Sequence, residues 1–133
     1  MSRILITGSR DYSDYDTISR GMVVAIDTMR AKFPDDMTIT FVHGAAPGAD
    51  TLADRFAKSA RKFLMSKGYT VEIEPHPADW SSFGKGAGPK RNKEMVDLGA
   101  DICIAFFSHP DSKGTRGCVT LAKAAGIEVL EYH

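Results

Sequence analysis

The order of short apolar segments and helical patterns is the feature of this sequence that most restricts its fold. Short apolar or β-branched runs, which predict strands, occupy residues 3–7, 38–43, 70–74, 101–107 and 127–130. Between them, apolar residues recur at steps of three and four, as on one face of a helix, within residues 18–33, 52–64, 89–98 and 114–125. Strands that alternate with amphipathic helices predict an α/β domain of three layers, in which helices cover both faces of a five-stranded, mainly parallel sheet.

Length and composition are those of one domain, predicted to span residues 1–133. With 43% hydrophobic residues the chain can bury a core, and its 17 basic and 17 acidic residues give zero net charge. Zero net charge disfavours broad binding to nucleic acid. No apolar run approaches the roughly 20 residues of a membrane span, and the first residues lack a signal-peptide pattern. We therefore expect a cytoplasmic protein without a membrane partner.

Ligands of a doubly wound sheet bind beyond the carboxyl ends of its strands, so the segments that follow the predicted strands are the first candidates. Gly8, Ser9 and Arg10 follow the first strand. A glycine lets backbone N–H groups approach an anion, while the serine and arginine add donors. A plain turn before a helix would use the same residues, and the sequence leaves both interpretations open.

The second strand is followed by small residues at 44–49, which leave backbone amides uncovered as in phosphate-binding loops. The segment is not a Walker A loop, because Ala49 and Asp50 stand where lysine and serine or threonine are required. We predict Asp50 as a helix N-cap in preference to a catalytic acid. If a nucleoside binds, Asp50 would accept from a ribose hydroxyl. His43 is interpreted as a buried histidine with satisfied hydrogen bonds.

The third segment holds the one local excess of positive charge, at Lys85, Lys90, Arg91 and Lys93. Arg91 shares a helical row with Met95 and Leu98, which predicts that it faces the sheet from the first turn of a helix. A cation is disfavoured at that end of a helix, so the sequence favours an anionic partner. Trp80 would either stack on a base or anchor the loop.

Gly114 and Thr115 open the last predicted helix and offer free amides and a hydroxyl to a phosphate, although Thr115 would also serve as a cap. Cys118 falls on the apolar face of that helix and is predicted to be a packed thiol. The two cysteines show no metal-binding spacing, so neither a metal nor a cofactor is expected. A positive rim on a neutral protein suits a small phosphate-bearing ligand.

In their order along the chain, these segments resemble the SLOG superfamily, and most closely its YspA-like branch. The matching segments are Ile6-Thr-Gly-Ser-Arg10, Val42-His-Gly-Ala-Ala-Pro-Gly-Ala-Asp50, Pro77-Ala-Asp-Trp80, Ala87-Gly-Pro-Lys-Arg-Asn92 and Gly114-Thr115. The resemblance implies a Rossmann-like fold that binds a nucleotide or nucleotide-derived ligand, as a sensor or sequestering protein, and it suggests a homodimer. The residues expected to bind the ligand are Gly8, Ser9, Arg10, Gly44, Ala45, Gly48, Asp50, Trp80, Arg91, Asn92, Gly114 and Thr115.

The resemblance extends to the LOG-type phosphoribohydrolases, which cleave the base from a nucleoside 5′-monophosphate. Arg91 matches their arginine, but Cys118 stands where they carry a glutamate, and glycosidic cleavage needs a carboxylate. Binding is therefore the leading hypothesis. The enzymatic alternative is an N-glycosidase with Arg91 and either Asp50 or Asp79 as catalytic residues. A third alternative, a DNA-processing accessory module, is disfavoured by the neutral charge.

Overall fold

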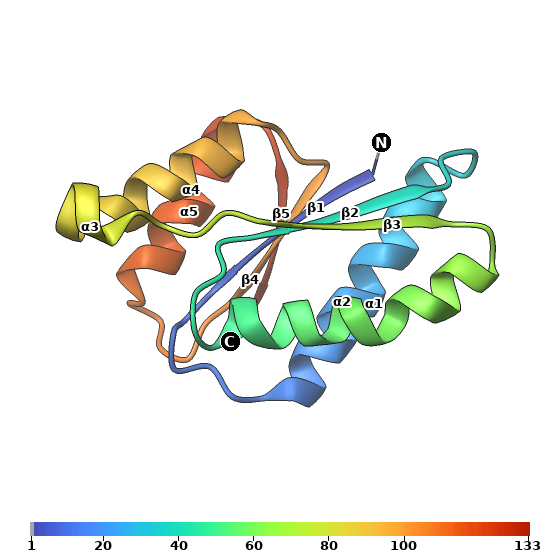
Figure 1. The fold of residues 1–133 in the computed structure, drawn as a ribbon, viewed down its shortest axis with the longest axis horizontal. Helices are drawn as coiled ribbons and strands as arrows, with labels where there is room; N and C mark the ends of the chain where they lie inside the picture. Colours follow the sequence, from blue (N-terminus) through green and yellow to red (C-terminus); the bar gives the residue numbers. More distant parts are fainter. Residues whose placement is uncertain (1) are drawn as a thin grey trace.

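In the computed structural model, which describes residues 2–133, five strands form one sheet in the order β3-β2-β1-β4-β5 (Figure 1). All neighbouring strands pair in parallel. The predicted α/β fold is confirmed, and the sheet is entirely parallel. The strands are β1 (Ser2–Gly8), β2 (Thr38–His43), β3 (Thr70–Pro75), β4 (Ile102–Phe106) and β5 (Glu128–Tyr132).

Helices cover both faces of the sheet, and the strand sequences show why. Ile4 and Ile6 belong to the apolar cluster formed with α1 (Tyr15–Lys32) and α2 (Ala49–Ser66). Leu5, between them, packs in the second cluster with residues of α4 (Ala87–Asp97) and α5 (Lys113–Ala124). Successive side chains of a strand point to opposite faces. A strand buried on both faces therefore reads as a continuous apolar run.

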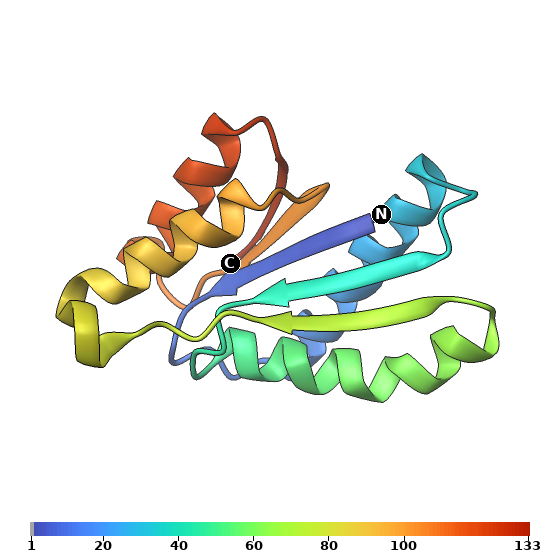
Figure 2. The same cartoon turned by 45° about the horizontal axis from the view of Figure 1, so that its top comes forward.

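The sheet is wound in two directions from its centre. The chain runs from β1 through α1 to β2 and through α2 to β3, and then returns to β4 on the other side of β1. The arrowheads of β1, β2 and β3 point toward one end of the sheet, where α3 (Trp80–Phe83) also lies (Figure 2). β1 and β4 flank the point where the winding reverses, which is where ligands bind in such sheets.

Several local expectations differ from the structure. The helix that carries Arg91 begins at Ala87, so Arg91 is its fifth residue and lies in the second turn. Met95 is buried as expected, whereas Leu98 is the C-cap and is 59% exposed. Phe63 is also exposed, and the ammonium nitrogen of Lys67 lies 5.5 Å from the centroid of the Phe63 ring. Periodicity in the sequence identifies the apolar face of a helix. It does not show which residues near the end of the helix extend past the buried core and become exposed.

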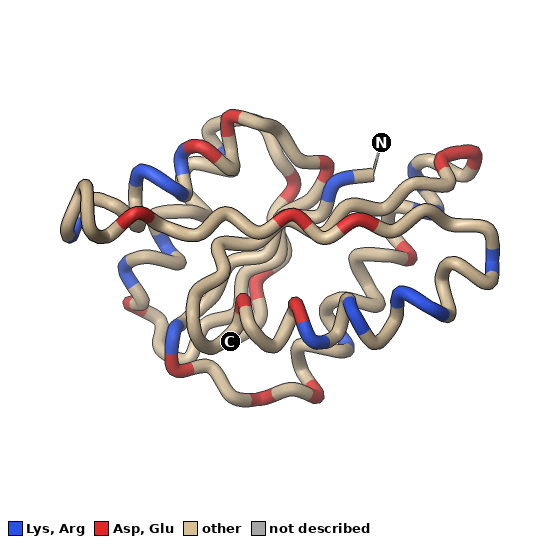
Figure 3. The backbone as a smooth tube through the Cα atoms, viewed as in Figure 1, with Lys and Arg blue, Asp and Glu red and all other residues tan. Residues whose placement is uncertain are grey.

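The segment between β3 and β4 has more structure than its sequence indicates. It contains the short helix α3, a 3₁₀ turn over residues 84–86, and then α4. Basic and acidic residues are interspersed along the chain (Figure 3). No helix within residues 2–133 is long and apolar enough to cross a membrane.

Candidate functional site

A cavity of about 370 Å³, called the first cavity below, lies beyond the carboxyl ends of the central strands. This volume falls in the range typical of small-molecule sites, roughly 300–1,000 Å³. The loops after β1, β2 and β4 and the helix α4 all contribute to it. Its lining consists of Thr7, Gly8, Ser9, Arg10, Asp11, Ala46, Asp50, Trp80, Gly88, Pro89, Arg91, Asn92, Ser112, Lys113, Gly114 and Thr115.

The start of α5 forms one wall of the first cavity and has the character of an anion site. Its first backbone bond within the helix runs from the N–H of Arg116 to the carbonyl of Ser112. The N–H groups of Lys113, Gly114 and Thr115 precede that bond and therefore have no acceptor inside the helix. Gly114 has no atoms near the position that a Cβ would take, which leaves its backbone open. Free amides, the helix dipole and the Lys113 ammonium all favour a negative charge here.

Ser9 fixes the position of this wall. Its hydroxyl accepts from the N–H of Ser108 at 2.9 Å and lies 2.8 Å from the hydroxyl of Ser112, the N-cap residue of α5. Ser112 makes no side-chain bond to its own helix. The serine after β1 thereby ties that loop to the loop after β4. Its hydroxyl is committed to the protein's own structure as well as lining the cavity.

Arg91 joins the opposite wall to the ends of β2 and β3. Its Nη1 donates to the carbonyl of Gly44 and, at 3.4 Å, to that of His76, while its Nε donates to Asn92 Oδ1 at 2.8 Å. A Cβ on Gly44 would collide with the guanidinium group, so Arg91 can keep this position only while residue 44 is glycine. Nη2 has no hydrogen-bond partner among residues 2–133 and is available to a ligand. Asn92 donates to the carbonyl of Gly114 at 3.4 Å, which links α4 to the start of α5.

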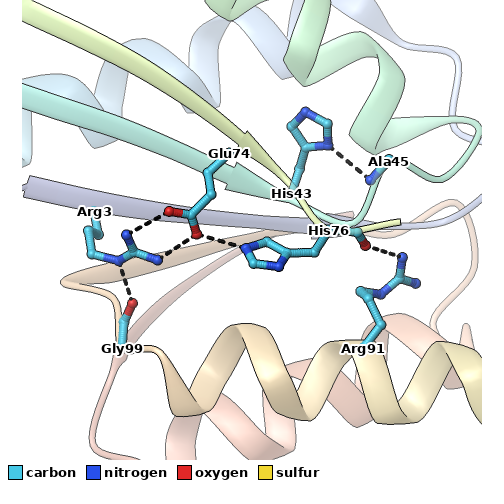
Figure 4. A network of polar contacts seen from close by, with 7 residues as sticks. All are labelled: Arg3, His43, Ala45, Glu74, His76, Arg91 and Gly99. Atoms are coloured by element: carbon cyan, nitrogen blue, oxygen red, sulfur yellow. Dashed lines mark hydrogen bonds and ion pairs between the residues drawn. The ribbon is translucent and has the colours of Figure 1, made fainter. Parts of the chain in front are cut away.

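A chain of polar contacts supports Arg91 from across the sheet (Figure 4). Arg3 donates to both carboxylate oxygens of Glu74, at 3.1 and 2.8 Å, and Nε2 of His76 donates to Glu74 at 2.7 Å. The hydrogen bonds from Arg3 lower the pKa of Glu74 to about 2. The carbonyl of His76 then accepts from Arg91. This chain fixes the backbone at the end of β3, against which Arg91 is held.

Asp50 is the buried carboxyl of the first cavity. It is 5% exposed, and its Oδ2 accepts from the N–H groups of Gly44 at 3.1 Å and Ala46 at 3.3 Å. Its Oδ1 is buried and has no partner among residues 2–133. Burial raises the pKa of this carboxyl, although the two N–H groups and Arg91 oppose the increase. The predicted N-cap role is wrong, because Gly48 occupies the N-cap of α2.

Asp50 and His43 together hold the loop after β2. His43 Nδ1 accepts from the N–H of Ala45 at 3.0 Å, and its Nε2 lies 2.9 Å from Asp54 Oδ1. Both ring nitrogens have partners and the side chain is buried, as predicted for a satisfied histidine. Ala45 has a φ of 55°, a left-handed conformation that is rare outside glycine. The two flanking side chains stabilise this unusual turn. The predicted phosphate cradle at residues 44–49 is therefore wrong for Gly44, Ala45 and Ala46, whose N–H groups donate to Asp50 and His43.

The glycines Gly8 and Gly48 act through packing. A Cβ on Gly8 would collide with Ala49 and lie 2.8 Å from the carbonyl oxygen of Phe106, and one on Gly48 would collide with the backbone of Ser9 and Arg10. These two positions bring the loop after β1 onto the start of α2. Gly8 lines the first cavity, whereas Gly48 does not.

Comparison with known proteins identifies the family. A model of the family described as "YspA, cpYpsA-related SLOG family" matches residues 2–83. The chain is also 42% identical to the "Gene 61 protein" of Mycobacterium phage D29 over 132 residues, which cover 99% of this chain and 97% of that protein. The chain belongs to this SLOG family. The matched range contains the loops after β1 and β2 and Trp80.

Most of the ligand-binding residues predicted for this SLOG protein meet at one place. Gly8, Ser9, Arg10, Asp50, Trp80, Arg91, Asn92, Gly114 and Thr115 all line the first cavity. Gly44 and Ala45 line a smaller neighbouring cavity. Asp79 lines neither cavity: it is exposed at the N-cap of α3 and accepts from the N–H of Ser82.

The prediction missed two charged residues of the SLOG cavity, Asp11 and Lys113. Lys113 directly precedes Gly114 at the start of a helix, and that position could have indicated it. Cys118, at the place of the LOG-type glutamate, is fully buried in the apolar cluster of β4 and α5, as predicted for a packed thiol. It does not line the cavity. Within residues 2–133 no group of three histidine, cysteine, aspartate or glutamate side chains could hold a metal ion.

Proposed function

We propose that this protein binds a small phosphate-bearing ligand of the nucleotide class in the first cavity and acts as a sensor or sequestering protein. The observation that carries the proposal is the meeting of three cationic side chains, Arg10, Arg91 and Lys113, with the free amides at the start of α5 around one cavity. Charge-assisted hydrogen bonds to a phosphate contribute roughly 1.5–3 kcal/mol each. Two or three of them approach the roughly 8 kcal/mol of micromolar binding, but the lost freedom of the ligand opposes them, so further contacts are needed.

Asp50 supplies a further contact of a different kind. Asp50 lines the same cavity, and its buried Oδ1 lacks a partner within the described chain. A buried polar atom without a hydrogen-bond partner destabilises the fold. A hydroxyl of a bound sugar would remove this cost by donating a hydrogen bond to Oδ1. A phosphate held at α5 and a sugar hydroxyl at Asp50 are together typical of a nucleotide.

Calorimetric titration with the four common ribonucleoside 5′-monophosphates, ribose 5-phosphate and inorganic phosphate tests the proposal. The side chain of Lys113 makes no hydrogen bond or ion pair with residues 2–133, so Lys113→Ala removes charge without breaking a side-chain contact of the fold. We expect it to weaken binding about tenfold, and Arg91→Ala by tenfold or more. Lys90→Ala is the matched control, since Lys90 lies on α4 outside the cavity and pairs with Glu94. Failure of every probe to bind would refute the proposal.

A second candidate function, cleavage of the N-glycosidic bond of a nucleoside 5′-monophosphate, is favoured by the state of Asp50. Burial raises the pKa of this carboxyl, and a protonated carboxyl can donate its proton to a leaving base. The test is incubation with nucleotides, followed by assay of free base and ribose 5-phosphate. Turnover that is lost in Asp50→Asn and kept in Asp79→Asn would assign the acid. Absence of turnover on every nucleotide would remove this candidate.

A further inference from the structure

A second cavity, of about 220 Å³, adjoins the first cavity at the ends of β2 and β3. The two share four lining residues, Arg10, Ala46, Trp80 and Arg91. The two cavities are therefore adjacent, with these four residues at their junction. The phosphate site at α5 lies only in the first, because Lys113, Gly114 and Thr115 do not reach the second.

The chemistry of the second cavity differs from that of the first. Apart from the shared arginines, its lining is apolar side chain or bare backbone: Gly44, Ala45, Ala46, Pro47, Pro77, Ala78 and Trp80. Neither an acidic residue nor a lysine lines it. Small, rigid residues next to one large aromatic ring form a surface suited to a flat, weakly polar group.

Trp80 is held in position at the junction of the two cavities. A Cβ on Gly88 would lie 3.1 Å from the Trp80 ring, so helix α4 supports the indole closely at that point. The Arg10 guanidinium carbon lies 5.6 Å from the ring centroid, near the outer limit of a cation–π contact. Trp80 is 46% exposed, so this contact is weak and a planar ligand can replace it.

We infer that the second cavity is a base subsite, so that the ligand is a mononucleotide whose ring stacks on Trp80 while its phosphate lies at the start of α5. Arg10, released from the indole, is then free to pair with the phosphate. Trp80 thereby determines specificity for a nucleotide over a bare sugar phosphate. The inference rests on the proposed function, because it requires a phosphate in the first cavity.

The experiment compares the affinities of the best-binding nucleoside 5′-monophosphate and of ribose 5-phosphate, which lacks only the base. Stacking of one base on one aromatic side chain predicts a ratio of roughly 5 to 150 in favour of the nucleotide. Trp80→Leu is expected to reduce this ratio to near one, because the nucleotide loses its stacking partner and ribose 5-phosphate has no base to stack. Phe83→Leu is the matched control, because Phe83 is an exposed aromatic of the same short helix that lines neither cavity.

A second measurement needs no variant. Trp80 is the only tryptophan of the chain, so its fluorescence reports directly on the junction. The nucleotide is expected to quench it more strongly than ribose 5-phosphate at equal saturation. Equal affinities for the two probes, or a ratio unchanged in Trp80→Leu, would overturn the base subsite and leave phosphate binding intact. Binding of neither probe would overturn both.

Discussion

Replacing Asp50 by asparagine removes a buried negative charge and keeps the shape of the side chain. In the wild type, Oδ2 accepts from the N–H groups of Gly44 and Ala46, and Oδ1 has no partner within residues 2–133. The asparagine oxygen can accept the same two bonds, while its NH₂ group takes the place of the unpartnered oxygen. Asp50→Ala, by contrast, leaves both N–H groups without an acceptor, at a cost of roughly 1–3 kcal/mol for the buried one and less for the other.

The two substitutions therefore differ in stability, and their difference from the wild type depends on pH. The folded pKa of Asp50 is raised above its ordinary value of 3.8. Between these two pKa values the folded protein binds more protons than the unfolded chain, so the wild type loses stability as the pH rises through that window. The asparagine side chain of the variant does not titrate. The free energy of unfolding of Asp50→Asn should therefore exceed that of the wild type. Within the window this difference grows by about 1.4 kcal/mol per pH unit, and above the window it stays constant.

Urea denaturation, followed by circular dichroism from about pH 4 to pH 8, measures these differences. We expect Asp50→Asn to be at least as stable as the wild type near neutral pH, and Asp50→Ala to be about 2 kcal/mol less stable than Asp50→Asn. A difference between wild type and Asp50→Asn that is flat with pH would refute the argument that burial raises the pKa. Equal stability of the alanine and asparagine variants would refute the structural role of the two hydrogen bonds.

Two further predictions concern the neighbourhood of Arg91 and the contacts across the sheet. Gly44→Ala should weaken phosphate binding about tenfold in calorimetry, because its Cβ displaces the Arg91 guanidinium, whereas Gly86→Ala, which meets no atoms, should leave it unchanged. The pKa of Glu74 is lowered from 4.5 to about 2, mainly by Arg3 and also by His76, so its stabilisation is complete above the unfolded value and is lost as the pH falls from 4.5 toward 2. The melting temperatures of wild type and Arg3→Met should therefore converge over that interval, and a constant gap would contradict this assignment.

Much of the fold could be predicted because each element carries its own local signal. Residues 3–7 form a strand buried on both faces, which a continuous apolar run indicates without reference to the rest of the chain. The steps of three and four from Ile18 to Met29 likewise identify the buried face of α1. The short helix α3 escaped prediction because four residues are too few for a period to appear.

The candidate site was predictable in part for the same reason. Glycine-containing loops at the ends of strands mark where backbone can approach a ligand, and the loops at Gly8, Asp50 and Gly114 do meet in the first cavity. The role of Asp50 was not predictable. An acidic residue at the start of a helix can either cap that helix or accept hydrogen bonds from the preceding loop. The backbone angles of the loop decide between the two, and the identities of the adjacent residues do not determine those angles.

The sequence alone determined the strands, the long helices and the places where the chain turns between them. These properties depend on side-chain periodicity and on residues within a few positions of one another. Only the tertiary structure decided that β1 lies between β2 and β4, and hence that Ser9 meets Ser112 and that Arg91 reaches the carbonyl of Gly44. Contacts between residues so far apart in the chain depend on the order of strands in the sheet. That order is set by the packing of whole helices and strands against one another. A pattern within a few neighbouring residues does not determine it.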